Sequence, residues 1–397
     1  MKKVLLRGPL LSNSGYGVHS RQVFEFLNSR KDIDLKCDIT PWGNTSWRLN
    51  QYEDKSYKNI PIILEKYILE KDISNYGFDE SYQVCFPNEW SRISNFDIGI
   101  TAGIEATICS SNWLHDINKM NKVIVPSEFT KKVFINSSDY YNIELNTEII
   151  VIPEYYHEEF DIKDNINNLN LDSIKTKKNV LISGQLTSLT EKLDRKNIFK
   201  TIEIVVREVS NFDDIGLIIK TNLGKNSIKD FMRLKKIMNK YYKELKKELG
   251  INTPEIYLIH GDMSPFELKS LYKSEKVSCF ISCTRGEGFG LQFLESAICN
   301  LPIIATNWSA YTEFLDFFLK VDYDIIDLDK EKIDNKLFVL NSKWAEFNED
   351  SLKEKIKEVF SKDYRKDTKI IQQRNKLVNK MSKSSIIDIY KEKLGRF

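Results

Sequence analysis

Residues 283–306, with the sequence CTRGEGFGLQFLESAICNLPIIAT, decide the fold of this chain. The short apolar run just before them, 277–281, predicts a buried strand. The glycines at 286, 288 and 290 predict a tight turn, and residues 291–299 have the composition of a helix. That helix is expected to stop at Asn300, because asparagine tolerates the left-handed conformation and Pro302 prevents continuation. A second strand over 302–305 completes the unit, whose elements are in order a strand, a glycine turn, a helix and a strand.

Two carboxylates lie within this unit, Glu287 in the turn and Glu295 in the helix, with seven residues between them. Open α/β sheets bind ligands at the carboxyl ends of their strands, where a helix amino terminus offers free N–H groups to a phosphate. The spacing therefore fits two carboxylates that face a bound ligand. It fits two solvent-exposed carboxylates equally well.

The ordered segments EGFG (287–290), LESA (294–297) and PIIAT (302–306) resemble the signature of the family-4 retaining glycosyltransferases of the GT-B fold. The resemblance implies an α/β protein with two Rossmann-like parallel-sheet domains that face each other across a cleft. It implies transfer of a sugar from a nucleotide-sugar to an acceptor hydroxyl, with retention of the anomeric configuration and without a metal. Glu287 would then hold hydroxyls of the reacting sugar and Glu295 the ribose, with Gly288, Phe289 and Gly290 lining the donor site.

Length and composition limit the possible classes of protein. A chain of 397 residues predicts two or three domains, and a net charge of +2 does not favour a nucleic-acid partner, although it does not exclude one. The first residues do not resemble a signal peptide, and no apolar run approaches the ~18 residues that span a bilayer. We therefore expect a cytoplasmic protein, with peripheral contact with a membrane as a further expectation. The six cysteines lack the paired spacing of a metal site, which favours buried thiols.

Predicted strands and helices alternate along most of the chain, as in parallel sheets covered by helices; residues 61–71 are one of the predicted helices. Residues 1–160 are expected to form an acceptor-side domain. Asp, Asn and Lys dominate the following stretch, so 161–178 is expected to be a linker. Residues 179–380 are expected to form the nucleotide-sugar domain, and 381–397 a terminal helix that crosses back to the first domain.

In the first domain, a Gly-x-Gly pair at Gly15 and Gly17 follows the first predicted strand and precedes the first helix. By itself this pair is a weak signal that also fits a simple turn. By resemblance, both glycines lie close to the donor diphosphate. Glu105 follows the strand predicted over 97–101, and it is the candidate to face the transferred sugar. The alternative is a carboxylate that only stabilises the start of a helix.

In the second domain, Arg195 and Lys196 precede a predicted helix. Two cations there oppose the helix dipole unless an anion lies between them, and a diphosphate is such an anion. Many relatives carry an arginine directly after the glycine of the preceding strand, but this chain has Gln185. Lys220, at the end of the next strand, is the candidate to replace that charge. Solvated surface cations remain the alternative.

Residues 225–248 predict a long helix with nine basic and three acidic residues. Such a charged face is usually solvated, and the alternatives are contact of the basic 225–247 stretch with an anionic membrane surface or an acidic acceptor. A UDP- or GDP-sugar is the expected donor, used as substrate and not as cofactor. The acceptor, a glycan, lipid-linked glycan, protein or modified nucleobase, stays open. The rival functions are a nucleotide-sugar epimerase of the same fold, expected to lack the Glu287 and Glu295 spacing, and a catalytically silent binding protein.

Overall fold

The computed structural model describes residues 1–43, 45–47, 58–162, 169–250 and 253–395. Part of the expected linker, 163–168, and the last two residues of the expected terminal segment, 396–397, lie outside the described residues. Two compact units make up the chain. The first unit comprises Met1–Tyr156, Ile333–Ser342 and Lys380–Phe397, and the second comprises His157–Lys332 and Lys343–Asn379.

The first unit is built on a six-stranded parallel sheet with the strand order β2-β1-β3-β4-β5-β6. Its strands are β1 (Lys2–Gly8), β2 (Ile33–Ile39), β3 (Phe78–Val84), β4 (Ser94–Ile100), β5 (Lys122–Val125) and β6 (Glu148–Val151). Its helices are α1 (Gly15–Asn28), α2 (Ile60–Glu65), α3 (Glu70–Tyr76), α4 (Ser111–Ile117), α5 (Glu128–Tyr141) and α12 (Lys383–Leu394). Val4, Leu5 and Leu6 are all fully buried, because helices cover both faces of the sheet.

The prediction of a single helix over 61–71 is wrong. The structure has two short helices there, α2 and α3, with an extended segment between them. In that segment Tyr67 forms a parallel bridge with Cys37 of β2. The backbone N–H of Cys37 donates to the carbonyl of Lys66 at 2.8 Å, and the N–H of Ile68 donates to the carbonyl of Cys37 at 3.0 Å. Pairing with the edge of the sheet therefore overrides the local helical pattern.

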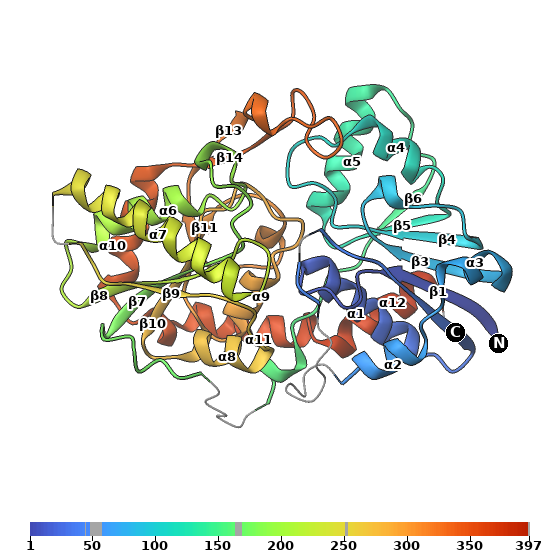
Figure 1. Ribbon diagram of the computed structural model, residues 1–397, viewed down its shortest axis with the longest axis horizontal. Coiled ribbons are helices and arrows are strands. Elements are labelled where there is room, and N and C mark those ends of the chain that lie inside the picture. Colours follow the sequence, from blue (N-terminus) through green and yellow to red (C-terminus); the bar gives the residue numbers. More distant parts are fainter. Residues whose placement is uncertain (44, 48–57, 163–168, 251–252, 396–397) are drawn as a thin grey trace. The chain divides into compact units, whose positions relative to one another are not determined.

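Helix α12 packs against α1 inside the first unit (Figure 1). The ring of Tyr390 stacks on that of Phe26 with centroids 4.7 Å apart, and Ile386 is fully buried in the same core. Lys383 adds an ion pair with Glu25 of α1 at 2.7 Å. The last described helix is therefore part of the core of the first unit.

The second unit repeats this plan with a parallel sheet of order β12-β11-β10-β7-β8-β9. Its strands are β7 (Lys178–Ser183), β8 (Ile215–Lys220), β9 (Ile256–Ile259), β10 (Val277–Ser282), β11 (Ile303–Thr306) and β12 (Leu319–Val321). An antiparallel hairpin is added by β13 (Tyr323–Asp327) and β14 (Lys343–Phe347). The helices are α6 (Ile198–Val209), α7 (Ile228–Leu249), α8 (Pro265–Lys273), α9 (Leu291–Ile298), α10 (Glu349–Ser361) and α11 (Thr368–Lys380). Short 3-10 turns in the two units are Pro87–Glu89, Glu158–Phe160, Glu191–Leu193, Ala310–Glu313, Lys330–Lys332 and Tyr364–Lys366.

Successive residues of β7 are buried on opposite faces of the second sheet. Val180 and Ile182 join a core to which α6, α7 and α10 contribute, while Leu181, between them, is also fully buried. Figure 1 shows helices on both sides of this sheet, with α8 and α11 on one side and α6 and α10 on the other. Two parallel sheets, each covered by helices, confirm the predicted α/β class with two Rossmann-like domains.

The turn and helix predicted around 283–306 are present. Helix α9 ends one residue before the predicted position, and Asn300 follows with a φ of 54°, in the left-handed region expected for it. All six cysteines are buried. Among the described residues, no helix combines the length and the apolar character that crossing a membrane requires.

Candidate active site

The glycine turn between β10 and α9 carries Glu287 at the carboxyl edge of the second sheet. Gly290 ends the turn with a φ of 92°, and a Cβ there would lie 2.9 Å from the Phe293 ring, so only glycine fits without strain. The backbone N–H of Glu287 donates to Ser309 Oγ at 3.1 Å, and its carbonyl accepts from the N–H of Ala310 at 3.3 Å. The segment after β11 therefore fixes the backbone that presents Glu287.

Three of the predicted site residues meet directly in the second unit. Lys196 Nζ lies 2.5 Å from Glu287 Oε1, and Arg195 Nη1 lies 3.4 Å from the same oxygen. Arg195 Nη1 also donates to the carbonyl of Gly286 at 2.5 Å. Burial by itself would raise the pKa of the Glu287 carboxyl, but Lys196 and Arg195 outweigh burial and the pKa is lowered. Glu287 is therefore a carboxylate at neutral pH.

The two cations that precede α6 have an anion beside them in this structure. Asn197, with a φ of 53°, begins α6, so Arg195 and Lys196 lie just outside the helix. The anion that compensates them in this structure is the Glu287 side chain. Glu287 thus supplies the anion that the dipole argument requires beside these two cations.

Asp194, fully buried, holds the segment that carries the two cations. Its Oδ1 accepts from the Thr187 hydroxyl at 2.6 Å and its Oδ2 from the N–H of Ile198 at 2.9 Å. The N–H of Arg195 in turn donates to Thr187 Oγ1 at 2.9 Å. The segment is pinned at both ends, which limits where Arg195 and Lys196 can lie.

A second network, which the sequence analysis missed, ties this segment to the glycine turn and to β14. The Arg285 side chain is almost completely buried and pairs with Glu346 of β14 through Nε at 2.8 Å and Nη2 at 2.5 Å. Arg285 Nη1 donates to the carbonyls of Glu191 at 2.8 Å and Asp194 at 3.0 Å. Arg285 therefore connects the two segments that form the ion cluster, the residues before α6 and the glycine turn.

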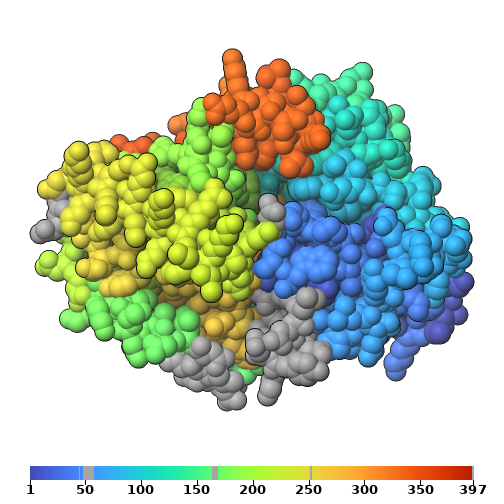
Figure 2. Space-filling model, in the orientation of Figure 1, coloured from blue at the N-terminus to red at the C-terminus, as the bar shows by residue number. Residues whose placement is uncertain are grey.

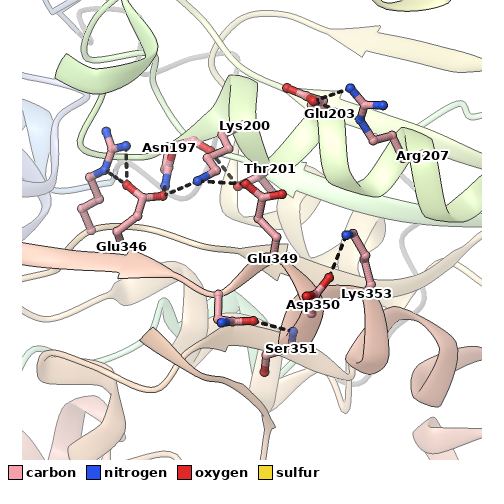
Figure 3. A network of polar contacts seen from close by, with 12 residues as sticks. Asn197, Lys200, Thr201, Glu203, Arg207, Glu346, Glu349, Asp350, Ser351 and Lys353 are labelled. Atoms are coloured by element: carbon pink, nitrogen blue, oxygen red, sulfur yellow. Dashed lines mark hydrogen bonds and ion pairs between the residues drawn. The ribbon is translucent and has the colours of Figure 1, made fainter. Parts of the chain in front are cut away.

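Glu346 also accepts hydrogen bonds from Asn197 and Lys200, as Figure 3 shows. Asn197 Nδ2 donates to Glu346 Oε1 at 3.0 Å, and Lys200 Nζ lies 3.3 Å from the same oxygen. Lys200 also reaches the more exposed Glu349 at 3.2 Å. One carboxylate thus joins β14, the start of α6 and the residue before the glycine turn.

Glu295 lies in α9, where its side chain is almost fully buried. His157 Nε2 approaches Glu295 Oε1 at 3.8 Å. Burial raises the pKa of the Tyr272 hydroxyl, and the charge of Glu295 raises it further. Glu295 therefore faces different neighbours from those of Glu287.

The other predicted donor residues of this unit have distinct surroundings. Phe289 is buried and packs on the ring of Phe314 at 5.2 Å, and Gly288 lies beside it in the turn. Lys220 ends β8 in register with Ser183 of β7, and its carbonyl accepts from the N–H of Gly184 at 3.1 Å. Lys220 therefore lies next to the position where relatives carry an arginine, while Gln185 itself is exposed.

Buried hydroxyls mark the same edge of the second sheet. The side-chain hydroxyls of Ser183, Thr221 and Thr306 lie at or just after the carboxyl ends of β7, β8 and β11. Each is buried without a hydrogen-bond partner among the described residues. Buried polar groups are normally paired, so this edge has hydrogen-bonding capacity that a polar ligand can use.

The first unit places Gly15, Gly17 and Glu105 near the carboxyl edge of its own sheet. A Cβ at Gly17 would lie 2.1 Å from the carbonyl oxygen of Ser12, so the loop cannot close without glycine there, whereas a Cβ at Gly15 would meet nothing within 4 Å. Glu105 is half-buried and close to Tyr16. Burial raises the pKa of the Tyr16 hydroxyl, and the charge of Glu105 adds to that shift.

Tyr16 is a further residue of this edge that the sequence analysis missed. Its hydroxyl lies 2.8 Å from Thr101 Oγ1 and accepts from the N–H of Ala102 at 3.1 Å, which links α1 to the segment after β4. Its ring stacks on Trp42 with centroids 4.1 Å apart and contacts Phe86 at 5.3 Å. No local sequence pattern marks Tyr16, since these partners come from separate strand ends.

The fold of this chain is similar to those of solved structures. The chain resembles a glycosyltransferase from Rickettsia africae ESF-5, with 16% identity, a TM-score of 0.58 and coverage of 100% of this chain and 99% of that one. It also resembles Anabaena HepE in complex with UDP and glucose, with 10% identity, a TM-score of 0.59 and coverage of 99% of both chains. Against the longer TarM of S. aureus, solved with UDP and sugar ligands, the identity is 16% and the TM-score 0.49; the alignment covers 82% of this chain and 57% of TarM.

No curated protein sequence is significantly similar to this chain. The match to a family model is confined to the second unit, and it contains Arg195, Lys196, Glu287 and Glu295. Residues 174–316 match the model described as glycosyl transferases group 1, and with the GT-B fold this match supports nucleotide-sugar glycosyl transfer.

Proposed function

We propose that the protein is a retaining glycosyltransferase that moves a sugar from a UDP- or GDP-sugar to an acceptor hydroxyl and needs no metal. The observation that carries the proposal is the ion cluster of Glu287 with Arg195 and Lys196 at the carboxyl edge of the second sheet. It places two cations and a carboxylate on adjoining segments, within the part of the chain that matches the glycosyltransferase family model.

The cations supply the charge stabilisation that the reaction needs. When the bond between sugar and nucleotide breaks, negative charge builds up on the departing diphosphate. Asp194 and Arg285 hold the backbone of the segment that carries Arg195 and Lys196, so only the two side chains change partner when the diphosphate binds. Stabilising the charge on the diphosphate is the role that a divalent metal has in other phosphate-releasing enzymes, and it is the reason that we propose a metal-independent reaction.

Donor binding exchanges one anionic partner of the cations for another. As the diphosphate takes over Lys196 and Arg195, the Glu287 carboxylate is released to accept hydrogen bonds from hydroxyls of the transferred sugar. While Lys196 and Arg195 contact it, the pKa of the Glu287 carboxyl is lowered, so Glu287 enters this exchange as a carboxylate, which accepts hydrogen bonds. We assign Glu295 to the ribose hydroxyls, Lys220, Gly288, Phe289 and Gly290 to the donor, Gly15 and Gly17 to its diphosphate, and Glu105 to the reacting sugar.

For retention we favour a same-face reaction in which the departing phosphate helps to deprotonate the acceptor. The alternative is a double displacement with a covalent intermediate on Glu287. Mass spectrometry of the enzyme after rapid quenching distinguishes the two. A sugar adduct on the peptide that contains Glu287 would rule out the same-face reaction.

Nucleotide release tests the function itself. The purified protein is incubated with UDP- and GDP-sugars, with and without a panel of glycan, lipid-linked and hydroxyl-bearing peptide acceptors. We expect nucleotide release that depends on an acceptor, and a product whose anomeric configuration by NMR equals that of the donor. An epimerised nucleotide-sugar formed without an acceptor would instead identify an epimerase, and nucleotide binding without turnover would identify a binding protein.

Thermal stabilisation identifies the donor base before any acceptor is known. A nucleotide at about 100 times its Kd adds roughly 2.7 kcal/mol to the free energy of unfolding. UDP is the first to test, because the similar fold of HepE was solved with UDP and glucose. Equal melting temperatures with UDP, GDP and ADP would contradict the proposed nucleotide-sugar site.

A further inference from the structure

Helix α7 and the residues just before it carry a large excess of positive charge. Residues 225–243 hold seven basic residues and one acidic residue, in a chain whose net charge is only +2. The seven are Lys225, Lys229, Arg233, Lys235, Lys236, Lys240 and Lys243, and all are exposed. Figure 2 shows α7, in yellow-green to yellow, spread over the visible surface of its unit.

The single acidic residue of this segment does not neutralise the exposed face. Asp230 points into the protein, where its carboxylate lies 2.8 Å from His260 Nε2 and accepts from the N–H groups of Leu223 and Lys225. The two other acidic residues of the helix lie near its end, where Glu244 pairs with Lys240 at 3.8 Å and Glu248 with Arg207 at 2.8 Å. The first four turns therefore carry positive charge outward.

Two apolar side chains interrupt the cations at the start of the helix. Ile228 is 80% exposed and Met232, one turn later, is 66% exposed. The inward stripe of the helix is formed by other residues, Leu234, Met238 and Leu245, which are buried in the core. Ile228 and Met232 are therefore not needed for the packing of α7, and they form an apolar pair beside Lys229 and Lys236.

We propose that the outer face of α7 binds an anionic lipid surface, with Ile228 and Met232 inserted among the lipid chains and the lysines against the headgroups. Helices that lie in a membrane interface combine apolar side chains with Lys and Arg in this way. The 22 residues of α7 span about 33 Å, so the basic side chains can contact several headgroups at once. The apolar pair favours lipid over nucleic acid, because a phosphate backbone offers no apolar phase for it.

Vesicle binding tests the proposal and does not depend on glycosyl transfer. Vesicles with equal parts of phosphatidylcholine and phosphatidylglycerol are compared with pure phosphatidylcholine by flotation. We expect binding to the mixed vesicles alone, weakened when the ionic strength rises to about 0.5 M. Since a Lys near an anionic surface contributes about fivefold to binding, the variant Lys229→Glu with Lys236→Glu should bind at least about 25-fold more weakly.

Matched variants distinguish binding by the face of α7 from a general effect of the protein's net charge. Lys177 and Lys366 lie outside α7 with side chains 87% and 86% exposed, so Lys177→Glu with Lys366→Glu makes the same change in net charge and should bind as the unmodified protein does. Ile228→Ser with Met232→Ser keeps the charge and should bind at least about tenfold more weakly.

Three results would overturn the proposal. The first is no binding to the mixed vesicles, and the second is an equal loss of binding in the Lys177 and Lys366 control. The third is duplex DNA bound as tightly as the vesicles, with the Ile228 and Met232 variant unaffected, which would identify a nucleic-acid surface. Failure of the proposed enzyme activity would leave the vesicle result unchanged, so the two proposals fail separately.

Discussion

Glu287 pairs with two cations of its own chain, and in the proposed reaction it accepts hydrogen bonds from hydroxyls of the sugar instead. Its contacts with Lys196 and Arg195 hold the three side chains together and lower the pKa of the Glu287 carboxyl. In enzymes, a group prepared in this way lowers the cost of organising charge during the reaction. The ion cluster therefore suits a site that receives an anionic ligand.

Replacing Glu287 with alanine should abolish sugar transfer while nucleotide binding is kept. We expect kcat to fall at least about 100-fold, as for other preorganised polar groups in active sites. UDP should bind as tightly or more tightly, because Lys196 and Arg195 lose their internal anion. Calorimetric titration with UDP and a transfer assay check both parts, and Glu295→Gln should show the opposite pattern, with weaker nucleotide binding. Loss of transfer and of binding together in Glu287→Ala would contradict the division of roles.

Glu154 is a buried carboxyl that the proposed reaction does not use. It follows β6 in the first unit, and burial raises its pKa from 4.5 to about 8. The neutral form is therefore favoured in the folded state at neutral pH, while the unfolded chain ionises above about pH 4.5. A folded pKa above the unfolded value means that stability is lost as the pH rises from 4.5 through 8.

Replacing Glu154 with glutamine should remove that pH dependence. At pH 4.5 the variant and the unmodified protein should have similar free energies of unfolding. At pH 7 the variant should be more stable by roughly 3 kcal/mol, since each pH unit above the unfolded pKa costs about 1.36 kcal/mol. Denaturant unfolding at several pH values measures the difference. A difference that stays constant with pH would show that Glu154 titrates normally in the folded protein.

Among the elements, hairpin β13–β14 acts on the candidate site through a single side chain. Glu346 of β14 forms an ion pair with Arg285 and accepts a hydrogen bond from Asn197, and these two residues hold the two segments of the ion cluster. Breaking a largely buried ion pair by removing one partner typically costs 3–5 kcal/mol, because the other charge stays buried.

We therefore expect Glu346→Ala to lower the free energy of unfolding of the second unit by about 3 kcal/mol and to lower kcat through displacement of Arg195 and Lys196. Glu349→Ala is the matched control, since Glu349 contacts the same Lys200 from a more exposed position and its loss should cost less than about 1 kcal/mol. Guanidinium unfolding and steady-state kinetics check the pair. Equal effects of the two substitutions would show that Glu346 is an ordinary surface partner.

The elements around the glycine turn are largely predictable because their signals are local. Helix α9 begins at the predicted residue 291 and ends at Ile298, one residue before the predicted end, and Asn300 has the left-handed conformation that its place before Pro302 predicts. The pairing of Tyr67 with β2 and the Arg285–Glu346 pair, whose residues lie 61 positions apart, depend on the tertiary fold. No window of sequence contains both partners, so these features could not be predicted.

At the candidate site, the sequence predicts the residue types and the structure adds their pairing. The two cations before α6 oppose the helix dipole, so the sequence predicts an anion beside them. It does not show that Glu287 supplies that anion. The buried hydroxyls of Ser183 and Thr221 likewise become visible only when strands far apart in sequence end at one edge.

At the scale of the whole molecule, the first unit depends on a helix that comes late in the chain. Tyr390 of α12 stacks on Phe26, and its hydroxyl has no hydrogen-bond partner among the described residues. Tyr390→Ala should therefore destabilise the first unit by about 3–5 kcal/mol, as for other large aromatic truncations. Tyr390→Phe keeps the stack and should be neutral or slightly stabilising, because it removes an unsatisfied polar atom.

Scanning calorimetry with and without UDP separates the units in this test. UDP should shift the transition of the second unit, and Tyr390→Ala should shift the other one. If Tyr390→Ala lowered only the transition that UDP raises, α12 would not belong to the stability of the first unit.

The division of the first unit among three stretches of chain also has a consequence for protein synthesis. Its core needs residues 383–394, which are made after every residue of the second unit, His157–Lys332 and Lys343–Asn379. Domains generally fold as units when their residues become available on the ribosome. The second unit is therefore expected to complete its fold first, so the order of folding during translation runs opposite to the order of the two sheets along the chain.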